Sequence, residues 1–352
     1  MATLTGGGEP AATVKTVAAH AGVSAQTVSR VLRGTGYVSE ATRARVLASV
    51  AAVGYRPNAV GRSLRATRTP MVGLLITDIT NPFYATLHKS TEAVFRERGL
   101  TLMLLNSDDD PATERTQLDL VSSYRPSGLL VAPAVHSTLT TEDLAGFGAA
   151  VLVSRTLPGL AVPSVVTNEP EAMGEATRAL LDAGHRRIVA VLGPRDASTT
   201  LRRESGYRDA VRAAGAEPIV RYTDQTGPGA RAAIRRALQA DPGLTAAVGF
   251  NAPVTEGILR GLRDEGLECP RDVSVVGFTD APWMSFYPPP ITVVGQPVAA
   301  MGELAARLLL DVLDGKPVTP GLHVVPSVLL RRESVAPPRP RPHDEKRTPC
   351  TS

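Results

Sequence analysis

The chain has 352 residues, of which 43% are hydrophobic and 20% are charged, a composition typical of soluble globular proteins. No apolar run approaches the roughly 20 residues that a membrane helix needs, so we expect no spanning segment. Met1–Pro10 has neither a basic flank nor an apolar stretch, so we expect no signal peptide. The two cysteines, Cys269 and Cys350, cannot build a disulfide framework or a zinc cluster, and the sequence therefore predicts a cytoplasmic protein.

The positive charge is concentrated at the N-terminus. Residues 1–68 carry nine basic and two acidic side chains, a formal charge of +7, whereas the remaining 284 residues carry −3. A small basic segment ahead of a mildly acidic body is typical of a nucleic-acid-binding module attached to another domain. A solvated charged surface would give the same imbalance, so charge alone leaves both interpretations open.

Residues 13–32 (TVKTVAAHAGVSAQTVSRVL) predict two short helices joined by a tight turn. Gly22 lies where a helix can end in the left-handed conformation, and Ser24 lies where the second helix begins. A third helix, Glu40–Val53, follows Ser39 as its N-cap. Such a helix-turn-helix can place its second helix in the major groove of DNA. A three-helix bundle without a ligand is the alternative interpretation.

The second helix is predicted to expose side chains suited to DNA. Gln26 can pair with adenine and Arg30 with guanine, each through two hydrogen bonds to a base edge. The hydroxyls of Ser24, Thr27 and Ser29 suit phosphate oxygens.

From Pro70 onward, short apolar runs alternate with amphipathic stretches. The runs predict buried strands and the stretches predict helices, beginning with Met71–Thr77 and Pro82–Glu97. Strands with continuous apolar runs, each followed by a helix, indicate a parallel sheet covered on both faces. We therefore predict an α/β core of two doubly wound subdomains, with a further helix at Pro297–Leu313 and a final strand at Val324–Leu330.

Several motifs resemble a known family. VSAQTVSRVL, followed by YVSEATRARVLASVAAVGYRPNAVGRSLR, is similar to the DNA-binding headpiece of the lac repressor–gal repressor family. Six further motifs extend the resemblance over roughly residues 13–335: DITNPFY at 78–84, GHRRIVAVLGP at 184–194, RRESGYRDA at 202–210, DVSVVGFTD at 272–280, PPPITVVGQP at 288–297 and SVLLRRESV at 327–335.

The resemblance implies a homodimer or higher oligomer that binds a pseudo-palindromic operator in double-stranded DNA and regulates transcription, here predicted as a repressor. A hinge helix from each protomer would enter the minor groove. The residues assigned to DNA are Ala25, Gln26 and Arg30 for bases, Ser24, Thr27, Ser29, Ser39, Thr42 and Asn58 for the backbone, and Leu64 as an apolar wedge between base steps. Gly61 stands inside the hinge helix where Ala is usual and costs about 1 kcal/mol of helix stability, so we expect the hinge to order only on DNA.

The resemblance also implies a periplasmic-binding-protein-like core with a small-molecule effector, a sugar, sugar derivative or other small metabolite, between its subdomains. It assigns Phe83, Tyr84, Arg203, Asn251 and Asp280 to this cleft. The two aromatic residues could stack on a ring or cap the helix that begins beside them. The arginine could bind hydroxyls or a carboxylate, or be a surface residue.

Some cleft positions depart from the family pattern. Ala252, Thr279 and Thr167–Asn168 stand at or beside positions where the family usually has acidic residues. Fewer carboxylates to bind sugar hydroxyls would favour an anionic or less hydroxylated effector over a neutral sugar.

Other chemistry lacks a motif. Asp108, Asp109 and Asp110 precede Pro111, where acidic residues favour the start of a helix, so we interpret them as caps and not as metal ligands. The chain has no P-loop, dinucleotide-binding turn, zinc-protease motif or nucleophile elbow, and its six histidines share no ligand spacing. We predict no enzymatic activity, cofactor or metal. The alternatives are a metabolic α/β enzyme with an incidental basic N-terminus, and a cytoplasmic small-molecule-binding protein whose headpiece has lost DNA binding.

The expected domain boundaries follow from these elements. They are a disordered lead-in at 1–12, a helix-turn-helix domain at 13–56, a hinge helix and linker at 57–69, a core at 70–335 with subdomain one at about 70–165 and 295–320 and subdomain two at about 166–294 and 321–335, and a disordered tail at 336–352.

Overall fold

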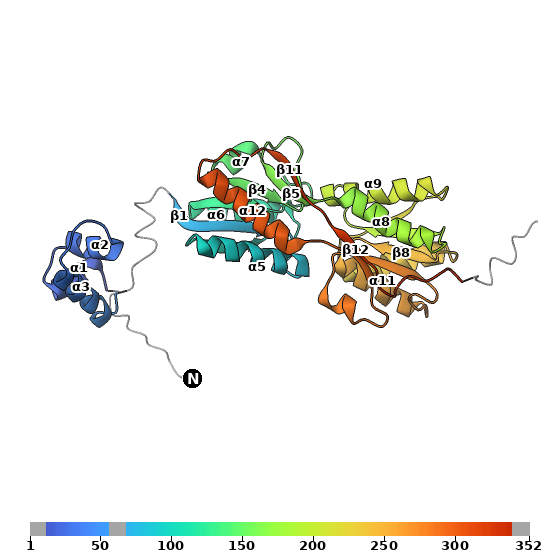
Figure 1. The fold of residues 1–352 in the computed structure, drawn as a ribbon, viewed down its shortest axis with the longest axis horizontal. Coiled ribbons are helices and arrows are strands. Elements are labelled where there is room, and N and C mark those ends of the chain that lie inside the picture. The colour runs from blue at the N-terminus through green and yellow to red at the C-terminus, as the bar shows by residue number, and fades with distance from the viewer. Residues whose placement is uncertain (1–11, 56–67, 340–352) are drawn as a thin grey trace, which may run out of the picture. The chain divides into compact units, whose positions relative to one another are not determined.

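The computed structural model describes residues 12–55 and 68–339, which belong to two separate compact units (Figure 1). The expected hinge residues Asn58, Gly61 and Leu64 lie outside the described residues. Within the described part of the chain, no helix combines the length and apolar content that a membrane crossing requires.

Residues 12–55, the described part of the first unit, form three helices, α1 (Val14–Ala21), α2 (Ala25–Arg33) and α3 (Glu40–Ala52), as predicted. α1 ends at Gly22, which has φ 64°, and the Ser24 side chain accepts a hydrogen bond from the Thr27 amide at the start of α2. The buried core is made of small apolar side chains from all three helices: Val17, Ala18, Ala21, Val28, Val31 and Val46. Leu47 of α3 is half exposed and lies outside this core.

The second unit contains two six-stranded sheets. The first has the strand order β11-β5-β4-β3-β1-β2, with every pairing parallel. Its strands are β1 (Thr69–Ile76), β2 (Thr101–Asn106), β3 (Pro126–Val131), β4 (Ala150–Val153), β5 (Pro163–Thr167) and β11 (Gly321–Val325). Its helices are α5 (Pro82–Glu97), α6 (Pro111–Ser123), α7 (Thr141–Ala145) and α12 (Val298–Leu313).

Helices cover both faces of this first sheet because its strands are apolar on both sides. Leu74 and Ile76 of β1 pack in one cluster with residues of α5 and α12, whereas Leu75 between them packs with residues of α6 and α7. This alternation is the period of two that a strand imposes on its side chains.

The second sheet has the order β12-β10-β9-β8-β6-β7, in which β12 alone runs antiparallel to its neighbour. Its strands are β6 (Ile188–Leu192), β7 (Ile219–Tyr222), β8 (Ala246–Gly249), β9 (Ser274–Phe278), β10 (Thr292–Gly295) and β12 (Val328–Leu330). Its helices are α8 (Glu169–Asp182), α9 (Ser198–Ala213), α10 (Gly227–Ala240), α11 (Ala252–Asp264) and the short 3₁₀ helix η1 (Pro282–Ser285).

The chain crosses between the sheets three times, after β5, after β10 and between β11 and β12 (Figure 1). The predicted fold class, two parallel-sheet α/β subdomains with an all-α N-terminal unit, is confirmed.

Three expectations near the C-terminus need correction. We expected residues 321–335 in the second subdomain, but Gly321–Val325 pairs with β5 in the first sheet. The predicted strand Val324–Leu330 is two strands, because Pro326 and Ser327 form the third crossing between the sheets. Ala336, which we expected in a disordered tail, is bound to the second subdomain, since its amide donates to Ser274 Oγ and its carbonyl accepts from His185 Nε2.

Candidate functional site

The outer face of α2 presents polar side chains to solvent. Ser24, Ala25, Gln26 and Arg30 are exposed. They lie opposite Val28, which is completely buried against α1 and α3. The helix is therefore anchored by its apolar face and leaves the side chains that we assigned to base edges free of the core.

Two helix starts in this unit carry the same pair of hydroxyls. Ser24 Oγ accepts from the Thr27 amide over 3.1 Å and lies 2.9 Å from Thr27 Oγ1. Ser39 Oγ accepts from the Thr42 amide over 3.4 Å and donates to Thr42 Oγ1 over 2.9 Å. Helix N-termini attract phosphate because their first amides point outward and the helix dipole is positive there. Both pairs are thus suited to contact a nucleic-acid backbone.

Tyr37 is a candidate that the sequence reasoning missed. It lies between α2 and α3, two residues before Ser39, and its side chain is 93% exposed. The hydroxyl of tyrosine is among the side-chain groups that bind phosphate oxygens of nucleic acids. Its position in the turn that precedes the Ser39 cap was the available signal.

The second unit contains a cavity of about 300 Å³ between its two sheets. It is lined from both subdomains by loops that follow β1, β2, β4, β7, β8 and β9. In open parallel sheets, ligands bind beyond the carboxyl ends of the strands, and all of these loops lie at those ends.

Phe83 and Tyr84 line this cavity and also belong to the core of the first subdomain. Their rings meet edge to face with centroids 5.1 Å apart, and both residues are buried at the start of α5. Tyr84 Oη accepts from Thr77 Oγ1 over 2.8 Å, and burial raises the pKa of Tyr84. We offered two interpretations of these rings, as a cap on the start of α5 and as a stacking surface for a ligand. Their position fits both, because they lie in the first turn of α5 and also line the cavity.

Arg203 lines the cavity and is 4% exposed, which excludes the surface-residue interpretation. Its guanidinium lies over the rings of Phe250 and Phe278, 4.4 and 4.0 Å from their centroids. Its Nε and Nη2 both donate to Glu169 Oε1, over 3.2 and 2.8 Å, and its Nη1 donates to the Phe250 carbonyl over 2.5 Å. The charge of Arg203 is therefore neutralised by Glu169, a buried residue that does not line the cavity.

Asn251 and Asp280 have different outcomes. Asn251 lines the cavity and caps α11, since its Oδ1 accepts from the Val254 amide over 2.9 Å. Asp280 does not line the cavity; it forms an ion pair with Arg332, with distances of 2.8 and 2.6 Å. The preceding Thr279 lines the cavity instead, and its φ of 68° lies in the left-handed region, so the alternation of the preceding strand does not continue through it.

Four carboxylates line the cavity that we did not assign to it: Asp78, Asp108, Asp109 and Asp224. Our expectation of an anionic or less hydroxylated effector rested on a shortage of carboxylates, and that premise is wrong. Of the three aspartates that we interpreted as caps, only Asp110 caps α6, by accepting from the Thr113 amide over 2.7 Å. In the described part of the chain, no group of three His, Cys, Asp or Glu side chains is placed to hold a metal ion.

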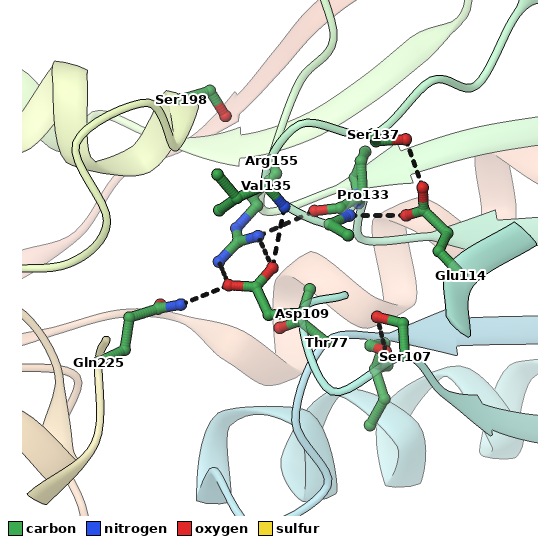
Figure 2. Close-up of polar contacts among 12 residues, drawn as sticks. Thr77, Ser107, Asp109, Glu114, Pro133, Val135, Ser137, Arg155, Ser198 and Gln225 are labelled. Carbon is green, nitrogen blue, oxygen red and sulfur yellow. Dashed lines mark hydrogen bonds and ion pairs between the residues drawn. The ribbon is translucent and has the colours of Figure 1, made fainter. Parts of the chain in front are cut away.

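Asp109 is the centre of a polar network in the cavity wall (Figure 2). It forms an ion pair with both terminal nitrogens of Arg155, and it accepts from the Val135 amide over 3.0 Å. Gln225 of the second subdomain donates to its other oxygen over 2.7 Å. Arg155 also donates to the Pro133 carbonyl over 3.0 Å, so three of its five N–H donors are used by groups of the protein.

Backbone strain is concentrated at the cavity. Seven described residues other than glycine have positive φ, and the five that line the cavity are Asp108, Asp109, Ser154, Gln225 and Thr279. Such residues persist only where the surrounding structure holds them, and they cluster at ligand clamps and switch regions. Such clustering is typical of ligand-binding sites, and it is an observation independent of the charges in the cavity.

Comparisons with known proteins agree with both sites. The model of bacterial regulatory proteins of the lacI family matches residues 13–58, and that of a periplasmic binding protein-like domain matches residues 177–335. The HTH-type transcriptional regulator GalR of Escherichia coli K12 is 30% identical over 335 residues, which cover 93% of this chain and 96% of GalR.

Two solved structures are similar over the same length. A transcriptional regulator CelR–cellobiose complex is 32% identical with a TM-score of 0.68, covering 92% of this chain and 99% of that chain. The lac repressor dimer bound to operator and the anti-inducer ONPF is 23% identical with a TM-score of 0.81, covering 93% and 100%, and shares the fold. With its helix-turn-helix unit, its two-sheet core and this similarity to GalR over nearly the whole length of both proteins, the chain belongs to the lacI family of bacterial regulatory proteins.

Proposed function

We propose that this chain is an operator-binding transcriptional repressor whose affinity for DNA is set by a small, uncharged, hydroxylated molecule in the cleft of its core. The observation that carries the DNA-binding half is the outer face of α2, where Gln26 and Arg30 are exposed beside an anchored apolar face. This exposure disfavours the alternative in which the headpiece has lost DNA binding.

The DNA contacts divide into two kinds. Gln26 and Arg30, with Ala25 beside them, read base edges in the major groove. The backbone contacts are Ser24, Thr27, Ser29, Ser39 and Thr42, to which we add Tyr37, and they position the helix without reading sequence. Asn58 as a further backbone contact and Leu64 as a minor-groove wedge remain predictions, because residues 57–67 lie outside the described part of the chain.

The effector class follows from the charges around the cavity. Carboxylates accept hydrogen bonds from hydroxyls, and the three lining aspartates that form no ion pair within the described residues, Asp78, Asp108 and Asp224, would repel an anion. Both lining arginines are already paired, Arg155 with Asp109 and Arg203 with Glu169, so neither offers a free cation to a phosphate or carboxylate. A neutral sugar fits this lining, and CelR, whose complex contains cellobiose, is similar in sequence and fold.

Regulation would use the two-subdomain core. A ligand that binds one arrangement of the subdomains more tightly shifts the population toward it, and coupling of ~1–3 kcal/mol would change operator occupancy by roughly 5- to 150-fold. We propose that two chains pair, so that two α2 helices meet the two halves of a pseudo-palindromic operator. The chain would act by binding, without catalysis, in the cytoplasm where the DNA lies.

A direct test measures DNA binding and ligand response together. The full chain is titrated onto the DNA upstream of its own gene by fluorescence anisotropy, with and without each neutral sugar that raises its melting temperature. A ligand at 100 times its Kd adds about 2.7 kcal/mol of stability and is readily detected. Specific binding that a sugar changes at least fivefold supports the proposal, whereas the absence of preference over unrelated DNA would refute it.

A further inference from the structure

Asp109 and Gln225 join the two subdomains inside the cavity lining. The Gln225 side-chain amide donates to Asp109 Oδ2 over 2.7 Å, although the two residues are 116 positions apart in the sequence (Figure 2). Asp109 follows β2 of the first sheet, and Gln225 follows β7 of the second. The two subdomains therefore touch at the point where a ligand would lie.

Both residues are held in place by their own subdomain. The Asp109 side chain is 18% exposed and is fixed by Arg155 and the Val135 amide. The Gln225 backbone N–H donates to Thr223 Oγ1 over 3.1 Å. The backbones of Asp109 and Gln225 have φ of 58° and 67°, a conformation that is rare outside glycine and that neighbouring structure must impose. The contact between Asp109 and Gln225 therefore joins two loops that are each held by contacts within their own subdomain.

The chemistry of this contact is that of a neutral donor on an ionised acceptor. A carboxylate has no hydrogen to donate, so Asp109 can receive only donor groups, and the Gln225 amide is one such group. A hydroxyl or an ammonium of a ligand would make the same contact. A phosphate or a carboxylate would not, since Asp109 repels it and Arg155 is already bound to Asp109 and the Pro133 carbonyl.

We infer that Gln225 is a competitor within the chain for the hydrogen-bond position on Asp109 that the effector uses, so that a donor-bearing, non-anionic effector displaces the Gln225 amide when it binds. This inference rests on the proposed function of the cleft, and it identifies Gln225 as a residue that controls effector binding there. Ligand binding then breaks a contact between the subdomains, which gives the ligand a differential affinity for the two arrangements of the core.

Other polar contacts between the subdomains lie outside this pair. The Thr156 amide donates to Ser198 Oγ over 3.0 Å, and His136 Nε2 lies 3.6 Å from Asp196 Oδ2. Because these contacts do not involve Gln225, its removal should loosen the two loops that form the pair and leave the rest of the core in place.

The first experiment needs no ligand. Hydrogen–deuterium exchange is followed in the full chain for wild type, Gln225→Ala, the isosteric Gln225→Glu, and Gln117→Ala on α6 as a control outside the cavity. The Gln225 variants should speed exchange at least threefold in residues 107–110 as well as in 223–226, because the first loop loses its partner. Unchanged exchange in residues 107–110 for both variants, at wild-type melting temperature, would overturn the inference.

The second experiment tests the ligand class by calorimetric titration. The probes are D-glucose, D-ribose and cellobiose as neutral donors, D-glucosamine as a cationic donor, and glucose 6-phosphate and ribose 5-phosphate as anions. A hydrogen bond to a charged group is worth about tenfold in affinity, so the tightest donor should bind Gln225→Ala roughly tenfold more tightly than wild type. Three results would each overturn the inference. They are that the phosphates bind best, that no donor binds, or that Gln225→Ala binds donors no more tightly than wild type.

Failure of this inference can be told from failure of the proposed function. If sugars bind and change operator affinity but Gln225→Ala behaves as wild type, only the competitor role is lost. If wild type shows no specific DNA binding, the proposed function itself is lost, whatever the exchange experiment gives.

Discussion

Arg203 and Glu169 form a buried ion pair behind the cavity, with both side chains no more than 5% exposed. Burial raises the pKa of Glu169 and lowers the pKa of Arg203, and the attraction between the two opposes both shifts. The rings of Phe250 and Phe278 lie close to the guanidinium, 4.4 and 4.0 Å from its carbon atom. The pair thus supports the wall of the cavity, which Arg203 also lines.

Removal of the carboxylate should destabilise the core strongly. Glu169→Ala leaves the Arg203 charge buried without a partner, a change that typically costs about 3–5 kcal/mol. Glu171→Ala, on the same first turn of α8 but exposed, is the matched control and should change stability by roughly 0.5 kcal/mol or less. Urea denaturation of the two variants measures this, and similar midpoints for both would contradict the role given to the pair.

Gly206 allows α9 to approach α8, and its replacement should be costly. A Cβ at this position would lie 1.9 Å from the Pro170 carbonyl oxygen, which is backbone and cannot rotate away. Gly206→Ala should therefore destabilise the core by about 1–3 kcal/mol or more. Gly146→Ala, where the nearest atom would be 3.5 Å away, should be close to neutral. Thermal melting compares them, and a Gly206→Ala variant as stable as wild type would show that the helices can separate freely.

His185 should make the core less stable in mild acid. Its ring is buried between Thr245 Oγ1 and the Ala336 carbonyl, both 2.9 Å away, and burial lowers its pKa. The unfolded state, with a pKa near 6.5, then binds a proton before the folded state does. The contribution of His185 is complete above about pH 7.5 and is lost as the pH falls through 6.5 toward the folded pKa.

The measurement is the free energy of unfolding between pH 8 and pH 5. Wild type and His323→Gln, a control at a residue bonded only to the exposed Thr319 carbonyl in the described structure, should lose stability with the same slope. His185→Gln should lose less over this interval. Equal slopes for all three proteins would mean that His185 titrates alike in both states.

Much of the fold is predictable from the sequence because local signals coincide with the elements. Gly22, Ser24 and Ser39 mark helix ends by their backbone and capping preferences, and α5 begins and ends at the predicted residues Pro82 and Glu97. The start of α9 at Ser198 carries no such signal, because its N-cap Ala197 makes no side-chain hydrogen bond.

The candidate site was less predictable, for two physical reasons. Whether Thr279 or Asp280 faces the cavity depends on backbone angles, and Thr279 has the positive φ that no local pattern indicates. The contact of Asp109 with Gln225 depends on how two sheets face each other, which is a long-range property of the fold. The sequence gives the residues of each loop, but it does not indicate which residue of another loop each side chain will contact.

The measurement that tests the central claim most directly is selection of binding sites from a pool of randomised DNA by the full chain and two variants, Arg30→Ala and Thr42→Ala. Arg30→Ala should relax base preference at one position in each half-site, at a cost of about 1–3 kcal/mol for the preferred base. Thr42→Ala, which alters a backbone contact, should weaken binding to all sequences alike. If Arg30→Ala selects the same sequences as wild type with the same preference, α2 does not read bases through Arg30 and the account fails.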